Sequence, residues 1–153
     1  MGATLLVVED DRWGRKIISD VLRRDGYEVV EAVDGAQAIE LLEHRSFDLV
    51  ISDVVMPKLD GLKLLEHIRR ISPRMRVILM SGYLFNESGK NSLVDKAEFL
   101  QKPFDFNVLL SMARREGVLW LRDHGTSGAA VVTIHQLTQL LSPNPLRSFD
   151  PSL

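Results

Sequence analysis

Short apolar runs alternate along the chain with longer segments in which apolar residues recur at helical spacing. The runs are flanked by polar or turn-forming residues and cover Thr4–Val8, Tyr27–Ala32, Phe47–Ser52, Arg76–Met80 and Glu98–Gln101. Runs of this length predict β-strands. The centre of the third run, Leu49-Val50-Ile51, is apolar without alternation, which is typical of a strand buried on both faces in a parallel sheet.

The segments between these runs predict amphipathic helices. We expect helices from Arg12 to Asp25, from Asp34 to Arg45, over Gly61–Ile71 and from Asp105 towards Arg122. Asp11, Asp34 and Asp105 are residues of the kind that caps a helix N-terminus. In the first helix, apolar residues recur at helical spacing: Trp13, Ile17, Ile18, Val21 and Leu22. Residues 84–96 are rich in Asn, Ser and Gly, so only a short helix is expected there.

Strand and helix alternate with short connections to about residue 122, which predicts an open parallel sheet with helices on both faces. The composition changes after Asp123, since residues 124–153 hold one basic residue, Arg147, and one acidic residue, Asp150. We therefore expect one domain over residues 1–123. A low-charge tail over 124–153 is expected to follow, with a short amphipathic helix at 133–141.

Composition narrows the class of protein. The 153 residues include no cysteine and carry a formal net charge of −2. The absence of cysteine excludes disulfides, thiolate zinc sites and cysteine nucleophiles. There is no basic excess to bind nucleic acid, and the apolar runs are far shorter than the roughly 18 residues of a membrane-spanning helix. We expect a soluble cytoplasmic protein that neither inserts into a membrane nor binds nucleic acid directly.

Acidic residues follow two of the predicted strands. Glu9, Asp10 and Asp11 come directly after the first strand, and Asp53 ends the third. Taken singly, each could be a solvated turn residue or a helix cap. Because the carboxyl ends of parallel strands share one edge of the sheet, Glu9, Asp10 and Asp53 are expected to meet there. Three such carboxylates either take up protons or recruit a cation, and ligands that are all oxygen suit Mg²⁺ or Mn²⁺.

Complementary groups end the next two strands. Ser81 supplies a hydroxyl after Met80, and Lys102 supplies an ammonium after Gln101. A cation at the acids would leave one carboxylate free to attack phosphorus, while Ser81 and Lys102 contact the phosphoryl oxygens. Either residue alone would carry little weight. Polar residues at four strand ends together favour phosphoryl transfer.

Four motifs follow one another in the chain: Leu5–Asp11, Asp53–Pro57 with Asp60-Gly61, Met80–Tyr83 and Phe99–Phe104. In content, order and spacing they resemble the receiver domain of two-component response regulators, over about residues 3–122. The resemblance implies a flavodoxin-like (βα)5 fold, an α/β architecture with a five-stranded parallel sheet between helices. It also implies that Asp53 is the phosphoacceptor, phosphorylated in a Mg²⁺-dependent reaction by a histidine kinase or a histidine phosphotransfer protein.

The same resemblance implies roles for the residues around the phosphoacceptor. Asp10 and Asp53 would bind Mg²⁺ directly, with Glu9 near the metal and the backbone carbonyl of Val55 completing the site. The chain would then be a signalling receiver rather than an enzyme, although it assists its own phosphorylation and dephosphorylation.

The resemblance also implies a conformational switch. Ser81, Lys102 and Phe99 would respond to phosphorylation and control a downstream protein partner, and a homodimer is a candidate assembly. The bond from Lys102 to Pro103 is a candidate cis peptide, which X-Pro bonds adopt at low cost. Val55 and Tyr83 occupy the positions that tune phosphoryl lifetime. Neither side chain offers a carboxylate or amide to orient water, so we expect slow hydrolysis.

Other functions stay open at this point. A pseudo-receiver that is never phosphorylated would act as a protein-interaction module. A phosphatase using aspartyl-phosphate chemistry typically has a second acid two residues after its nucleophile, where this chain has Val55. A flavodoxin-like cofactor binder needs a phosphate-cradling loop after the first strand, where Glu9, Asp10 and Asp11 would repel phosphate. A DNA-binding transcription factor is not expected, because the nearly uncharged residues 124–153 are too few for that domain.

Overall fold

The computed structural model of the chain describes residues 2–82 and 97–114. The strands are β1 (Thr4–Val8), β2 (Glu28–Ala32), β3 (Leu49–Asp53), β4 (Arg76–Ser81) and β5 (Glu98–Gln101). The helices are α1 (Arg12–Arg24), α2 (Gly35–His44), α3 (Gly61–Ile71) and α4 (Phe106–Arg114). These strands and helices fall within two residues of the predicted bounds, except that the description of the last helix stops at Arg114.

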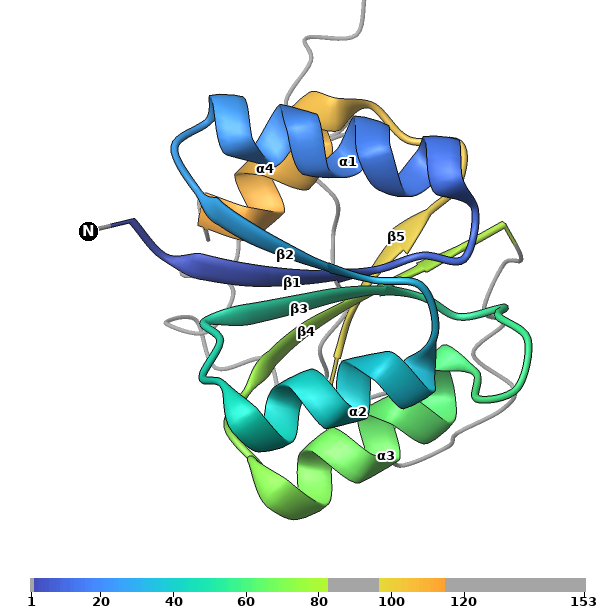
Figure 1. Cartoon of the computed structure of the whole chain (residues 1–153). Helices are drawn as coiled ribbons and strands as arrows, with labels where there is room; N and C mark the ends of the chain where they lie inside the picture. The colour runs from blue at the N-terminus through green and yellow to red at the C-terminus, as the bar shows by residue number, and fades with distance from the viewer. Residues whose placement is uncertain (1, 83–96, 115–153) are drawn as a thin grey trace, which may run out of the picture.

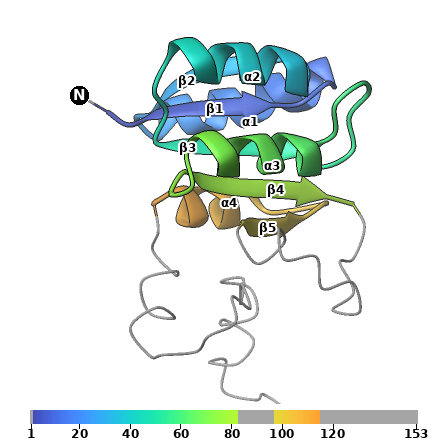
Figure 2. The ribbon, with the colours of Figure 1, turned by 90° about the horizontal axis from the view of Figure 1, so that it is seen from below.

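The five strands are parallel and form one sheet in the order β2-β1-β3-β4-β5, as Figure 2 shows. Helices α1 and α4 cover one face of this sheet, and α2 and α3 cover the other (Figure 1). The predicted fold class is therefore confirmed. Strand order reverses between β1 and β3, and ligands of open α/β sheets bind outside the carboxyl ends of the strands at such a reversal.

The core consists of two apolar layers, one on each face of the sheet. Successive residues of β1 alternate between them: Leu5 and Val7 join the layer with α1 and α4, whereas Leu6 and Val8 join the layer with α2 and α3. All five residues of β3 are buried. This two-sided burial explains the uninterrupted apolar run in the centre of the third strand.

In the described part of the chain, four aspartates accept hydrogen bonds at helix starts and so have a structural reason to be present, and three of them are N-caps. Each N-cap accepts a hydrogen bond from a backbone N–H in the first turn: Asp11 from Gly14 at 2.6 Å, Asp34 from Gln37 at 2.8 Å, and Asp60 from Lys63 at 2.9 Å. Asp105 accepts similarly from the N–H of Asn107 at the start of α4. These bonds satisfy N–H groups that have no partner within the helix.

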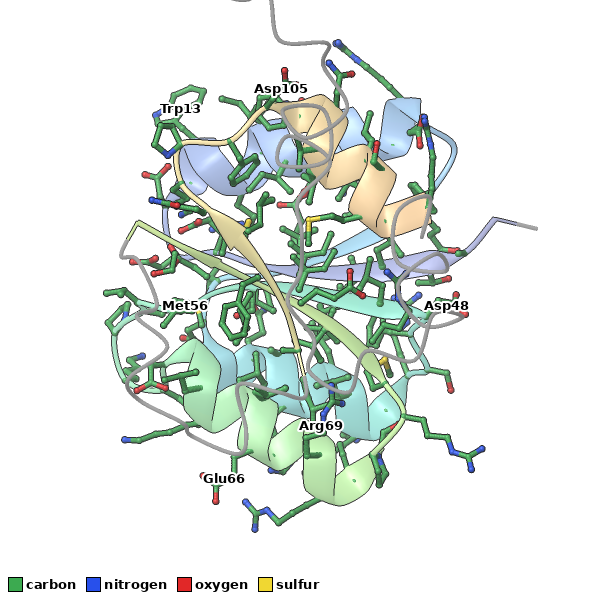
Figure 3. All side chains as sticks on the ribbon, turned by 180° about the vertical axis from the view of Figure 1, so that it is seen from behind. Trp13, Asp48, Met56, Glu66, Arg69 and Asp105 are labelled. Carbon is green, nitrogen blue, oxygen red and sulfur yellow. The ribbon has the colours of Figure 1, made fainter. Side chains whose placement is uncertain are left out.

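Two apolar residues of α1 that recur at helical spacing lie outside its buried face. Trp13 and Ile17 are 67% and 48% exposed. The buried residues of α1 are Ile18, Ser19 and Leu22, so the inward stripe is centred nearer to Ser19 than apolar spacing alone suggests. Trp13 lies on the outside of the molecule (Figure 3), with the guanidinium of Arg12 at 5.9 Å from its ring centroid.

Several expectations fall outside the described residues. They are the short helix at 84–96, the continuation of the last helix beyond Arg114, and the tail 124–153 with its helix at 133–141. Among the residues that are described, no helix is long and apolar enough to cross a membrane.

Candidate metal centre

The ends of β1 and β3 bring three acids together. Val8 lies beside Ser52 in the parallel register, so the acids that follow these two residues also become neighbours. Carboxylate oxygens of Glu9, Asp10 and Asp53 lie within 4.8 Å of one another. Glu9 and Asp53 are only 2% and 9% exposed, whereas Asp10 is open to solvent. The acids that the sequence analysis expected to meet at this edge do so.

Glu9 is held through both its backbone and its side chain. Its N–H donates to the carbonyl of Ala32 on β2 at 3.2 Å. One side-chain oxygen accepts from the N–H of Asp11 at 3.1 Å, and the other accepts from Nζ of Lys102 at 2.8 Å. Burial raises the pKa of Glu9, and the hydrogen bond from Lys102 offsets only part of that effect.

Lys102 bridges the two buried acids. Its ammonium donates to Glu9 and also to Oδ2 of Asp53, at 2.8 Å in each case. Burial by itself would lower the pKa of Lys102, but the hydrogen bonds to Asp53 and Glu9 outweigh it and raise the pKa. The other oxygen of Asp53 accepts from the N–H of Val55 at 3.2 Å. Lys102 is thus a cation placed between Glu9 and Asp53, and it remains charged at neutral pH.

Backbone bonds between neighbouring strand ends fix the remaining groups. The N–H of Lys102 donates to the carbonyl of Ser81 at 2.7 Å, and the N–H of Val54 donates to the carbonyl of Met80 at 2.9 Å. The Lys102–Pro103 peptide bond is cis. Ser81 is buried at the end of β4, with 3% exposure. These bonds tie the ends of β3, β4 and β5 into one edge.

The other residues named from sequence lie around this edge or outside the described chain. Val55 is 59% exposed, beside the acids, and it contacts Asp53 through its amide. Phe99, within β5, is half-buried and packs against the apolar layer under α2 and α3. Tyr83 lies outside the described residues.

The donor set fits a hard divalent cation. One ammonium faces three carboxylates, so negative charge is in excess within this cluster. The converging ligand atoms are carboxylate oxygens, which suit Mg²⁺ rather than a soft metal. Glu9, Asp10 and Asp53 are the residues that could hold the ion.

Sequence reasoning missed one residue that supports these acids. The guanidinium of Arg15, on α1, donates to the backbone carbonyl of Glu9 at 2.7 Å. The sequence feature that could have indicated Arg15 is its position four residues after Asp11. It lies one turn into the helix that follows the acidic loop, residues 9–11. A basic residue there faces back towards the loop.

Comparisons with known proteins agree with this geometry. The chain matches the family model described as "Response regulator receiver domain" over residues 5–114. It is 41% identical over 120 residues to the response regulator protein FleR of Pseudomonas aeruginosa, covering 77% of this chain and 25% of FleR. It is 37% identical over 117 residues to the chemotaxis protein CheY of Bacillus subtilis, covering 72% of this chain and 93% of CheY. The chain thus spans only a quarter of FleR's length but nearly all of CheY.

A solved structure has the same fold as this chain. The response regulator protein TrrA of Thermotoga maritima, crystallised in complex with Mg²⁺–BeF, is similar to this chain with a TM-score of 0.68. The two sequences are 29% identical, and the match covers 75% of this chain and 98% of that chain. Its fold is that of the sheet and helices described above.

Proposed function

The chain belongs to the response regulator receiver domain family, and from that premise we propose that Asp53 accepts a phosphoryl group from a phosphohistidine donor. The observation that carries this proposal is the buried Asp53 carboxylate beside two further acids and Lys102 at the carboxyl edge of the sheet. In other receivers this module serves two-component signalling.

The chemistry needs one oxygen of Asp53 as nucleophile. A carboxylate oxygen attacks phosphorus, the P–N bond of the donor breaks, and its electron pair stays on the imidazole nitrogen. When bound, Mg²⁺ supplies charge neutralisation to the acids and the incoming phosphoryl group. The amide of Val55 orients Asp53 by holding Oδ1, and Lys102 can exchange its bond to Oδ2 for one to a phosphoryl oxygen.

The complex of TrrA with Mg²⁺–BeF supports the assignment of Mg²⁺ to this site. That relative is described with Mg²⁺–BeF bound. In the present chain, the acids Glu9, Asp10 and Asp53 would hold the cation, together with the backbone carbonyl of Val55. Mn²⁺ has the same preference for oxygen ligands and is the alternative ion.

The conformational response is proposed to run through Ser81, Lys102 and Phe99. The added phosphoryl group brings charge and acceptor oxygens to Asp53. Because the N–H of Lys102 is bonded to the carbonyl of Ser81, movement of either residue towards the new group is transmitted to the other strand end. Phe99 then repacks against the layer it already contacts.

Slow loss of the phosphoryl group is a further part of the proposal. The Val55 side chain lies exposed beside Asp53 and cannot orient water for attack on phosphorus. Val55→Asn supplies an amide at this place and should shorten the lifetime roughly tenfold, a modest share of what a positioned polar group contributes. Decay of the phosphorylated protein, followed by intact mass, measures this. Equal half-lives for the two proteins would contradict it. Tyr83 is proposed for the same role.

The partners and limits of the domain are also proposals. A histidine kinase or histidine phosphotransfer protein would supply the phosphoryl group, and a downstream protein or a second copy of the chain would read the response. The family match at 5–114 supports a receiver domain within residues 1–123, with 124–153 as an attached tail.

Intact-mass analysis after incubation with acetyl phosphate and Mg²⁺ tests the proposed function. The wild type should gain one phosphoryl group, and it should gain none when the metal is chelated. Asp53→Asn should gain none in Mg²⁺, although its circular dichroism spectrum stays that of the wild type. A folded wild type that never gains the group would instead be a pseudo-receiver, that is, an interaction module.

A further inference from the structure

Arg15 lies beneath the acidic loop without offering a ligand to it. Its side chain is only 13% exposed. One terminal nitrogen donates to the carbonyl of Glu9 at 2.7 Å and makes a longer contact of 3.5 Å to the carbonyl of Asp10. The guanidinium therefore touches the backbone of two residues whose side chains converge on the candidate cation site.

Arg15 is itself held in place by an ion-pair chain. Its Nε lies 3.4 Å from Oε2 of Glu31 on β2. The other oxygen of Glu31 accepts from Arg23 at 3.0 Å, and Arg23 also donates to the carbonyl of Val29 at 3.1 Å. This series of ion pairs connects β2 through α1 to the loop that holds Glu9 and Asp10. It limits the positions that the guanidinium of Arg15 can adopt.

We propose that Arg15 is the positioning residue of the metal centre, holding the backbone of Glu9 and Asp10 so that their carboxylates converge. The Glu9 residue is tied on both sides, because its N–H donates to Ala32 and its carbonyl accepts from Arg15.

Charge and position give opposite expectations for this arginine. As a nearby cation, the guanidinium would by charge alone weaken the binding of another cation, although Glu31 balances part of its charge. As a positioning group, it would strengthen binding by keeping the ligands converged. The sign of the change in Mg²⁺ affinity on removing Arg15 therefore distinguishes the two roles.

Titration of the full chain with Mg²⁺ by isothermal calorimetry is the test, and it rests on the proposed function. Arg15→Ala should weaken binding roughly tenfold, at the low end of what loss of an outer partner of metal ligands costs. Arg15→Lys keeps a donor for the Glu9 carbonyl and should recover part of the affinity. Lys16→Ala is the matched control: it removes the same charge from the next residue of α1, whose side chain pairs with Asp20 at 2.7 Å in solvent.

A second readout separates positioning from loss of fold. In phosphorylation by acetyl phosphate, Arg15→Ala should need roughly tenfold more Mg²⁺ for half-maximal rate, while its rate at saturating Mg²⁺ stays within about twofold of the wild type. Arg15→Ala binding Mg²⁺ as tightly as Lys16→Ala, or more tightly, overturns the positioning role alone. A wild type that binds no Mg²⁺ overturns the proposed function and this inference together.

Discussion

Charged groups are paired differently at the amino edge of the sheet, where the strands begin, and at the carboxyl edge, where they end. At the amino edge, each of two acids has a donor of its own: Asp48 accepts from the N–H of Thr4 at 2.8 Å, and Arg76 pairs with Glu98 at 2.9 Å. The second carboxylate oxygen of Glu98 is buried and has no hydrogen-bond partner among the described residues. At the carboxyl edge, Glu9, Asp10 and Asp53 crowd together around one lysine. Figure 3 shows the two edges on opposite sides, marked by Asp48 and by Met56.

This difference suggests separate roles: the contacts at the amino edge stabilise the fold, whereas the acids at the carboxyl edge serve function. Arg76 also donates to the carbonyls of Met112 and Ala113 on α4, at 2.7 and 3.1 Å. It thus joins the start of β4 to the last described helix through bonds that need no ligand. The carboxyl edge keeps an excess of negative charge, which a bound cation or a proton can neutralise. Sites kept ready for function commonly sacrifice stability in this way.

The largest effect on stability is expected at the amino edge. Arg76→Ala leaves Glu98 largely buried without its partner and removes the donor to the carbonyls of Met112 and Ala113, so the free energy of unfolding should fall by about 3 kcal/mol. Urea denaturation measures this. Arg74→Ala, an exposed arginine two residues away, should change stability by less than about 0.5 kcal/mol. Equal effects of the two substitutions would show that the Arg76 network contributes nothing special.

A smaller loss is expected where the backbone approaches the phosphoacceptor. A Cβ at Gly61 would lie 2.3 Å from the carbonyl oxygen of Asp53 and 2.9 Å from Cα of Val54. Gly61→Ala must therefore shift the β3–α3 loop, and it should cost about 1–3 kcal/mol of stability. Gly82→Ala is the control, because an added Cβ there meets no atom of the described residues within 4 Å. A Gly61→Ala protein as stable as Gly82→Ala would mean that the loop can move freely.

The opposite sign is expected for an acid of the carboxyl edge. Asp10 is exposed and lies close to two other carboxylates. Asp10→Asn should leave the free energy of unfolding unchanged or raise it by up to about 1 kcal/mol in metal-free buffer. Asp105→Asn removes the same charge outside the cluster and keeps a capping side chain, so it controls for net charge. A clear loss of stability in Asp10→Asn alone would argue against repulsion at this edge.

The smallest effect is a pH dependence in metal-free buffer. Because the pKa of Glu9 is raised in the folded state, the folded protein binds this proton more tightly than the unfolded chain does. Stability therefore falls as the pH rises from the ordinary glutamate pKa through the raised one. The wild type should gain stability relative to Glu9→Gln as the pH is lowered through that window. Parallel pH profiles for the two proteins would contradict the raised pKa.

Much of this contrast was accessible from sequence. Strand bounds, the meeting of Glu9, Asp10 and Asp53, and capping by Asp11 and Asp34 follow from local patterns and from the geometry shared by parallel sheets. Such features can be predicted from the spacing of apolar and polar residues and from the direction of the strands alone.

Other features depend on details that a pattern does not contain. Trp13 and Ile17 follow helical spacing, yet the sheet buries the side of α1 that carries Ser19. Arg15 binds a backbone carbonyl, an acceptor that every residue has, so its partner is not visible in residue types. The two hydrogen bonds from Lys102 to Glu9 and Asp53 likewise depend on side-chain placement across distant segments.

We propose that the carboxyl edge binds a cation independently of the amino edge. The most direct test is the increase in the free energy of unfolding caused by Mg²⁺ in the wild type, Arg76→Ala and Asp10→Asn. At a concentration one hundred times the Kd, the ion should add about 2.7 kcal/mol to the wild type. The same increase in Arg76→Ala and little or none in Asp10→Asn is the predicted result. An equal increase in wild type and Asp10→Asn, or none in the wild type, would contradict the account.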